Sequence, residues 1–196
     1  MLTNARQCAL ALALGVALGI TTTVTLPEQL WTRPLGSRLA VTSDMPPGWS
    51  EIKWPFGVDQ WSSGKAFKCG VVACGGEVTL YLRAKIGFCN CTMGIVDDAE
   101  LERHADLDHF GGTLSANAPG RPIAVRWMKG RSRSYEVTGT SPDGKSALLI
   151  AFNDRCDAIV GTVIVSHDRP AAVEQAIIDF LNGDLVMSWA EVTLGL

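Results

Sequence analysis

Apolar and polar side chains alternate over residues 77–86, which predicts a half-buried antiparallel strand. Such a strand packs its apolar face on the core and leaves its polar face in contact with water. The predicted apolar face carries Val78, Leu80, Leu82, Ala84 and Ile86, and the predicted polar face carries Thr79, Tyr81, Arg83 and Lys85.

Two further pairs of apolar runs predict β-hairpins. Residues 123–128 and 134–138 flank Lys129, Gly130 and Arg131, where we place the first turn. Residues 147–153 and 158–165 flank a second turn at residues 154–157. The apolar runs beside this second turn are nearly continuous, which is typical of central strands.

Helical patterns occur in two places. Residues 97–108 begin with acidic side chains, which suit the positive end of a helix dipole, and Gly111 ends the pattern. Residues 168–170 are expected to begin a longer amphipathic helix, with Asp168 as N-cap, Pro170 in the first turn and Gly183 at its end. Its apolar positions have the spacing of a helix packed on a sheet: Val173, Ala176, Ile177, Phe180 and Leu181. We expect the tail, residues 185–196, to add an edge strand.

Together these elements predict an α+β fold. Its mainly antiparallel sheet carries the C-terminal amphipathic helix and one shorter helix packed on it. Parallel βαβ units are disfavoured because the middle strands are joined by short turns.

The first 26 residues are expected to direct export. Residues 8–26 contain no charged side chain and follow Arg6, which is typical of a signal peptide or of an N-terminal membrane anchor formed by a transmembrane helix. The positive-inside rule keeps Arg6 in the cytoplasm and places the rest of the chain outside. Residues 27–47 contain four prolines and are expected to form a tether. Residues 48–196 then form a single exported domain.

Composition supports a globular domain and excludes several classes of protein. The chain is 47% hydrophobic and 19% charged, unlike a disordered acidic chain. Its 17 basic and 20 acidic residues provide no positive excess for general nucleic-acid binding. Removing residues 1–26 removes only Arg6, so the exported domain is slightly more acidic than the whole chain.

Five cysteines lie beyond the apolar segment: Cys69, Cys74, Cys89, Cys91 and Cys156. In an oxidising compartment we expect two disulfides and one free thiol, with the connectivity left open. A bond between Cys89 and Cys91 is disfavoured because residues two apart on a strand are too far separated. Alternatively, Cys69, Cys74, Cys89 and Cys91 are thiolates that bind a soft metal such as zinc or copper, or that exchange disulfides.

A basic segment offers a candidate binding surface. Arg126, Lys129, Arg131 and Arg133 follow one another without an acidic residue between them. Such a segment is either a solubilising turn or a docking point for an acidic partner protein or for anionic lipid headgroups.

Two other groups of side chains have alternative interpretations. Trp49, Trp54, Phe56, Trp61 and Phe67 either cover one edge of the core or form an exposed aromatic binding surface. The group His104, Asp106, Asp108 and His109 is interpreted as a solvated acidic helix rather than a metal site, because Asp106 points away from the face shared by His104 and Asp108.

Three runs of sequence carry a resemblance: GWSEIKWPF, CGGEVTLYLRAKIGFCNC and AFNDRCDAIVGT. They resemble an uncharacterised family of small exported bacterial proteins, which implies an exported bacterial protein and no particular activity. The strand-rich body with a late amphipathic helix is also similar to the PsbP/Mog1-like α/β/α arrangement, a similarity of fold alone.

The sequence contains no serine-hydrolase, phosphate-loop or zinc-protease motif. We therefore expect a non-enzymatic accessory or binding domain without a cofactor, which engages a protein partner. Its expected location is the periplasmic side of a bacterial inner membrane, or the periplasm if the N-terminal segment is cleaved. The alternatives are a thiol or soft-metal protein that uses the four cysteines, and a hydrolase whose site no motif marks.

Overall fold

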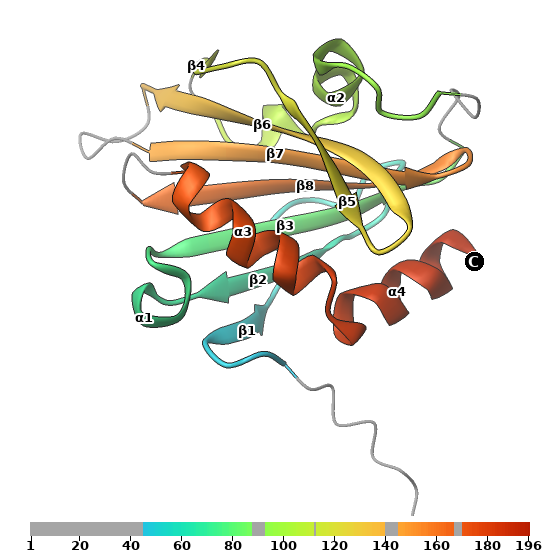
Figure 1. The fold of residues 1–196 in the computed structure, drawn as a ribbon, viewed down its shortest axis with the longest axis horizontal. Coiled ribbons are helices and arrows are strands. Elements are labelled where there is room, and N and C mark those ends of the chain that lie inside the picture. The colour runs from blue at the N-terminus through green and yellow to red at the C-terminus, as the bar shows by residue number, and fades with distance from the viewer. Residues whose placement is uncertain (1–44, 88–92, 112, 140–144, 167–169) are drawn as a thin grey trace, which may run out of the picture. The chain divides into compact units, whose positions relative to one another are not determined.

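Antiparallel pairing joins every strand of the computed structural model into one sheet (Figure 1). The structure describes residues 45–87, 93–111, 113–139, 145–166 and 170–196, all within one compact unit that spans Val41–Leu196. The expected export segment, most of the expected tether, Cys89, Cys91 and Asp168 lie outside the described residues.

Eight strands form the described sheet, in the order β1-β2-β3-β8-β7-β6-β4, and β5 also pairs with β6. Their bounds are β1 Trp49–Ile52, β2 Lys65–Cys69, β3 Val78–Lys85, β4 Thr113–Ala116, β5 Arg121–Val125, β6 Met128–Thr138, β7 Lys145–Asp154 and β8 Asp157–Ser166. The helices are α1 Val71–Cys74, α2 Asp98–His104, the 3₁₀ turn η1 Leu107–His109, α3 Pro170–Leu181 and α4 Asp184–Leu194. The expected antiparallel sheet with helices packed on it is confirmed.

Each face of the sheet has its own hydrophobic core. The C-terminal helices α3 and α4 cover one face, where Ile177 and Met187 pack with side chains of β3 and β7 such as Leu80 and Ile150. On the opposite face, Leu101 of α2 packs with Leu149 and other side chains of β7 and β8. The sheet is therefore the middle layer of an α/β/α arrangement (Figure 1).

The strand expected at residues 77–86 is confirmed as β3, with a different polar face. Val78, Leu80, Leu82 and Ala84 are buried as expected, whereas Ile86 lies beyond the strand end and is 51% exposed. On the other face, Arg83 and Lys85 are buried. The expectation that this face meets water is wrong at these two positions, because both find carboxylate partners outside the strand.

The hairpin β7–β8 has the expected turn, but the turn of the β5–β6 hairpin was misplaced. The observed turn consists of Arg126 and Trp127. Lys129, Gly130 and Arg131, where the turn was expected, belong to β6. Arg126 supplies the turn with a positive φ of 51°. Gly130 is needed for close packing rather than for a turn, since a Cβ there would lie 2.2 Å from the carbonyl oxygen of Ala151.

The long amphipathic helix is confirmed as α3. The helix expected at residues 97–108 is α2, which is shorter than expected. Helix α2 begins after Asp97, whose side chain accepts the N–H of Glu100 at 2.8 Å, and ends at His104. The expected edge strand in the tail is wrong. Residues 184–194 form α4, which buries Val186, Met187, Ala190 and Leu194 at helical spacing and ends at Gly195.

Candidate functional site

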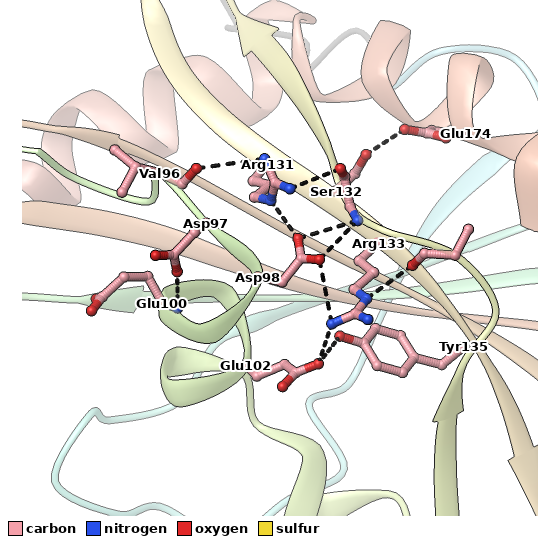
Figure 2. A network of polar contacts seen from close by, with 12 residues as sticks. Val96, Asp97, Asp98, Glu100, Glu102, Arg131, Ser132, Arg133, Tyr135 and Glu174 are labelled. Carbon is pink, nitrogen blue, oxygen red and sulfur yellow. Dashed lines mark hydrogen bonds and ion pairs between the residues drawn. The ribbon is translucent and has the colours of Figure 1, made fainter.

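A polar network joins helix α2 to strand β6 (Figure 2). Alternation along β6 directs Arg131, Arg133 and Tyr135 to the face that α2 covers. Helix α2 presents Asp98 and Glu102, which lie four residues apart and so share one helix face. The network therefore depends on matching the two-residue period of a strand to the turn of a helix.

The two carboxylates divide the cationic and phenolic donors between them. Arg131 Nε lies 2.5 Å from Asp98 Oδ1, and Arg133 Nη1 lies 2.7 Å from Glu102 Oε1. The Tyr135 hydroxyl donates to the same Glu102 oxygen at 2.7 Å. Burial, and then the nearby Glu102 carboxylate, hold the pKa of Tyr135 far above its ordinary value.

The network also fixes the connection between β4 and β5. Gly120 donates its backbone N–H to Asp98, while Arg131 Nη2 donates to the Gly120 carbonyl at 2.8 Å and Arg133 Nε to the Ala118 carbonyl at 3.0 Å. The Gly120 N–H is the main cause that lowers the pKa of Asp98, and the two arginines lower that pKa further. The arrangement therefore acts as a clamp on residues 118–120.

On the opposite side of β6 the network continues to α3. Ser132 Oγ donates to Glu174 Oε1 at 2.6 Å, and Arg121 Nε lies 3.0 Å from the same oxygen. Both Ser132 and Glu174 are buried. A cleft of about 180 Å³ opens beside them, below the ~300 Å³ at which small-molecule pockets usually begin. The Glu174 carboxylate already binds the Arg121 guanidinium and the Ser132 hydroxyl. We therefore interpret the contact between Ser132 and Glu174 as a structural lock, a contact that stabilises the packing of α3 on β6.

No protein-family model matches this chain, and no curated protein sequence matches it.

The basic residues expected to share one surface are divided between the α2 side of the sheet and the end of the β5–β6 hairpin. Arg131 and Arg133 form ion pairs with Asp98 and Glu102 on the α2 side of the sheet. Arg126, at the tip of the β5–β6 hairpin, forms an ion pair with Asp184. Lys129 is exposed on β6. Only the hairpin tip therefore keeps the character of a docking surface.

The tip of the hairpin is fixed to the junction of α3 and α4. Arg126 N donates to Asn182 Oδ1 at 2.6 Å, and Arg126 Nε donates to the Asn182 carbonyl at 3.1 Å. These contacts attach the turn to Asn182, between α3 and α4. The next residue, Trp127, is 55% exposed. We define Arg126, Trp127 and Lys129 as the hairpin-tip surface.

No sequence pattern described above marks Trp127, Glu174 or Asn182 as a functional residue. A usable signal existed for Glu174, an acidic residue next to Val173 on the apolar stripe of α3. A turn at Gly130 would place Trp127 within a strand, whereas the structure places Trp127 in the turn. The role of Asn182 depends on two elements meeting in space, which no local pattern contains.

The aromatic residues between positions 49 and 67 contact other parts of the domain: Phe67 is buried, and Trp49, Trp54, Phe56 and Trp61 are half-buried. Trp49 stacks on Phe180 with ring centroids 3.9 Å apart. Trp54 and Phe56 pack on each other at 5.1 Å, and both contact Tyr81 of β3. These contacts agree with the interpretation that large rings cover one edge of the core.

The expectation of disulfide bonding is confirmed for Cys69 and Cys74, which are bonded across α1. Cys156 is also disulfide-bonded, and its partner lies outside the described residues. The first bond occupies two of the four sulfurs that the metal alternative requires as thiolates. In the part of the chain that the structure describes, no group of three or more His, Cys, Asp or Glu side chains could hold a metal ion. None of the helices described is long and apolar enough to cross a membrane.

Proposed function

We propose that this protein is a non-enzymatic accessory or binding domain that engages a protein partner through the hairpin-tip surface. On the basis of the N-terminal sequence, we place its site of action at the periplasmic side of a bacterial inner membrane. The observation that supports the binding role is the exposed indole of Trp127, held on a turn that Asn182 and Asp184 fix.

The residue types at this tip are those that dominate protein interfaces. Tryptophan and arginine are enriched among the residues whose removal most weakens a complex. A large ring that is exposed in the free protein gains apolar burial on binding. Because the contacts of Arg126 already order the turn, little further conformational entropy is lost when a partner covers Trp127.

The charges at the tip favour a partner with an apolar pocket bordered by carboxylates. Lys129 is exposed, and the Arg126 guanidinium is 40% exposed beside Asp184. Positive side chains around an exposed ring guide the approach of an acidic protein surface. Anionic lipid headgroups would contact the same positive charges but offer no pocket for the Trp127 indole. Binding to a protein partner should therefore depend on Trp127 more strongly than binding to lipid.

Photo-crosslinking in the full-length protein tests this proposal. A photoreactive amino acid replaces Trp127 in cells of the producing bacterium, and a second variant carries it at Val192, which is 84% exposed on α4. We expect one protein adduct from position 127 that position 192 does not give. Trp127→Ala should weaken co-purification of that protein about tenfold or more, the effect of losing about 1.4 kcal/mol or more of binding free energy.

Two outcomes would contradict the proposal. Adducts that are equally abundant at both positions would show non-specific contact. Adducts with lipid alone, unaffected by Trp127→Ala, would show that the basic side chains serve a membrane surface instead.

A further inference from the structure

The polar face of β3 contains two buried cations. Arg83 is 1% exposed and Lys85 is 4% exposed, and they lie two residues apart, so both project from the same face of the sheet. A buried charge is costly unless a counter-charge accompanies it. The partners of these two cations therefore define what the face can bind.

Two carboxylates from separate loops meet the cations. Arg83 Nη1 lies 2.7 Å from Asp59 Oδ2, and Lys85 Nζ lies 2.7 Å from Asp106 Oδ1. Asp106 Oδ1 is also 3.5 Å from Arg83 Nη1, which links the two pairs. The backbone N–H of Trp61, which donates to Asp59, and the Arg83 guanidinium both lower the pKa of Asp59.

A cleft of about 360 Å³ opens over this arrangement, within the size range of small-molecule sites. It is lined by Asp59, Gln60, Trp61, Lys85, Ala105, Asp106, Asp108 and His109. Lys85 Nζ lies 4.8 Å from the centre of a Trp61 ring, and the ring of His109 stacks on Phe56 at 4.7 Å. Both aromatic groups of the cleft are therefore held in place by neighbours.

The balance of charge in the cleft disfavours simple ions. An anion would meet Asp59, Asp106 and Asp108, whereas a cation would meet Lys85 at the floor. Hydrogen-bonding capacity is abundant, since carboxylates accept and the Gln60 amide and Lys85 ammonium donate. Deeper in the structure, Arg83 Nε, Arg83 Nη2 and Trp54 Nε1 are buried without a hydrogen-bond acceptor in the described part of the chain. Hydrogen-bond donors are thus in excess at Arg83 and Trp54, beneath the cleft. Hydrogen-bond acceptors are in excess among the carboxylates that line it.

We infer that this cleft binds a neutral polyhydroxylated ligand of the saccharide class. Each hydroxyl group both donates and accepts, which matches a site with carboxylates beside amide and ammonium donors. The indole of Trp61 supplies an apolar surface for the C–H face of a sugar ring. This inference uses no residue of the hairpin-tip surface, so it stands or fails independently of the proposed protein partner.

Saturation-transfer NMR on the full-length protein tests the inference, in a detergent whose headgroup is not a sugar. The neutral probes are glucose, N-acetylglucosamine and maltose, and the ionic probes are inorganic phosphate and choline. We expect saturable binding of at least one neutral probe with a millimolar dissociation constant, an affinity of about 4 kcal/mol. Neither ionic probe should compete with it.

Variants at the border of the cleft locate the site. Trp61→Ala should weaken sugar binding about tenfold, and Gln60→Ala several-fold, since Gln60 is exposed and its loss leaves the buried charges intact. Val58→Ala is the matched control in the same loop: Val58 is 77% exposed, is not among the residues that line the cleft, and should bind as the unmodified protein does.

The inference is overturned if no sugar binds saturably up to about 20 mM, a concentration that detects millimolar affinity. It is also overturned if phosphate or choline displaces the bound sugar. Unchanged sugar binding in both Trp61→Ala and Gln60→Ala would move the site elsewhere and equally reject this cleft.

Discussion

Both carboxylate oxygens of Asp98 accept the backbone N–H of Gly120, at 3.1 and 3.0 Å. A side chain cannot be added at this glycine without disturbing the contact. A Cβ at position 120 would lie 2.3 Å from Asp98 Oδ1 and 2.9 Å from the carbonyl oxygen of Ser132. The glycine and the aspartate therefore depend on each other.

Gly120→Ala should lower the free energy of unfolding by about 1–3 kcal/mol, because the new methyl group must displace the Asp98 carboxylate or the β6 backbone. Urea unfolding measures the change. Gly57→Ala is the control, since a Cβ at position 57 would meet nothing within 4 Å. If the two contacts are coupled, the Gly120→Ala, Asp98→Ala double variant loses less stability than the two single losses combined. Simple additivity would contradict the coupling.

Glu174→Ala should destabilise the domain by about 2–4 kcal/mol, since it leaves the buried Ser132 hydroxyl without its acceptor and creates a cavity beside β6. Ser132→Ala removes only the donor and should cost about 1 kcal/mol. The neighbouring exposed side chain of Gln175, changed to alanine, provides the control for α3. Equal unfolding midpoints for Glu174→Ala and Gln175→Ala would refute the structural lock between β6 and α3.

Removing the Cys69–Cys74 disulfide should destabilise the domain by about 2 kcal/mol, because the bond closes only a short loop of chain. The Cys69→Ala, Cys74→Ala double variant measures this effect without leaving a single unpaired thiol. In the unmodified protein, alkylation after denaturation without reductant should leave Cys69, Cys74 and Cys156 unlabelled. Labelling at these positions, or stoichiometric zinc or copper, would instead support the thiol or metal alternative.

Both tyrosines of the chain should resist ionisation in the folded protein. Burial raises the pKa of Tyr81, and burial together with Glu102 raises that of Tyr135. The unfolded chain ionises both near pH 10. Each raised pKa therefore contributes stability that is complete below about pH 10 and is lost as the pH rises further. Absorbance at 295 nm should show tyrosinate later in native than in denatured protein, and coincident curves would disprove it.

Regular apolar patterns in the sequence predict the position of most elements. The periodicity of apolar residues locates strand β3 and helix α3 correctly, although the polar face of β3 is also partly buried. The expected edge strand at residues 185–196 is wrong. That expectation depended on the apolar residues Trp189, Val192 and Leu194. In the structure the buried set is instead Val186, Met187, Ala190 and Leu194, a helical spacing.

The candidate sites were harder to predict because their residues come from distant parts of the chain. The buried state of Arg83 and Lys85 depends on Asp59 and Asp106, which the alternation within β3 does not reveal. Similarly, the basic segment looked unneutralised in sequence because Asp98 and Glu102, its counter-charges, lie some thirty residues away on α2. Net charge over a window measures composition and not the spatial pairing of charges.

The pairing of β3 with β8 at the middle of the sheet has a consequence for how this chain folds. Val78 pairs with Val165 and Lys85 with Ala158, so this central contact joins segments separated by roughly seventy residues or more, a topology that slows folding. During synthesis, the edge of β3 that pairs with β8 stays open until β8, the last strand, emerges. The short loop closed by Cys69 and Cys74 is local and can form early, whereas the central β3–β8 contact must wait for the last strand.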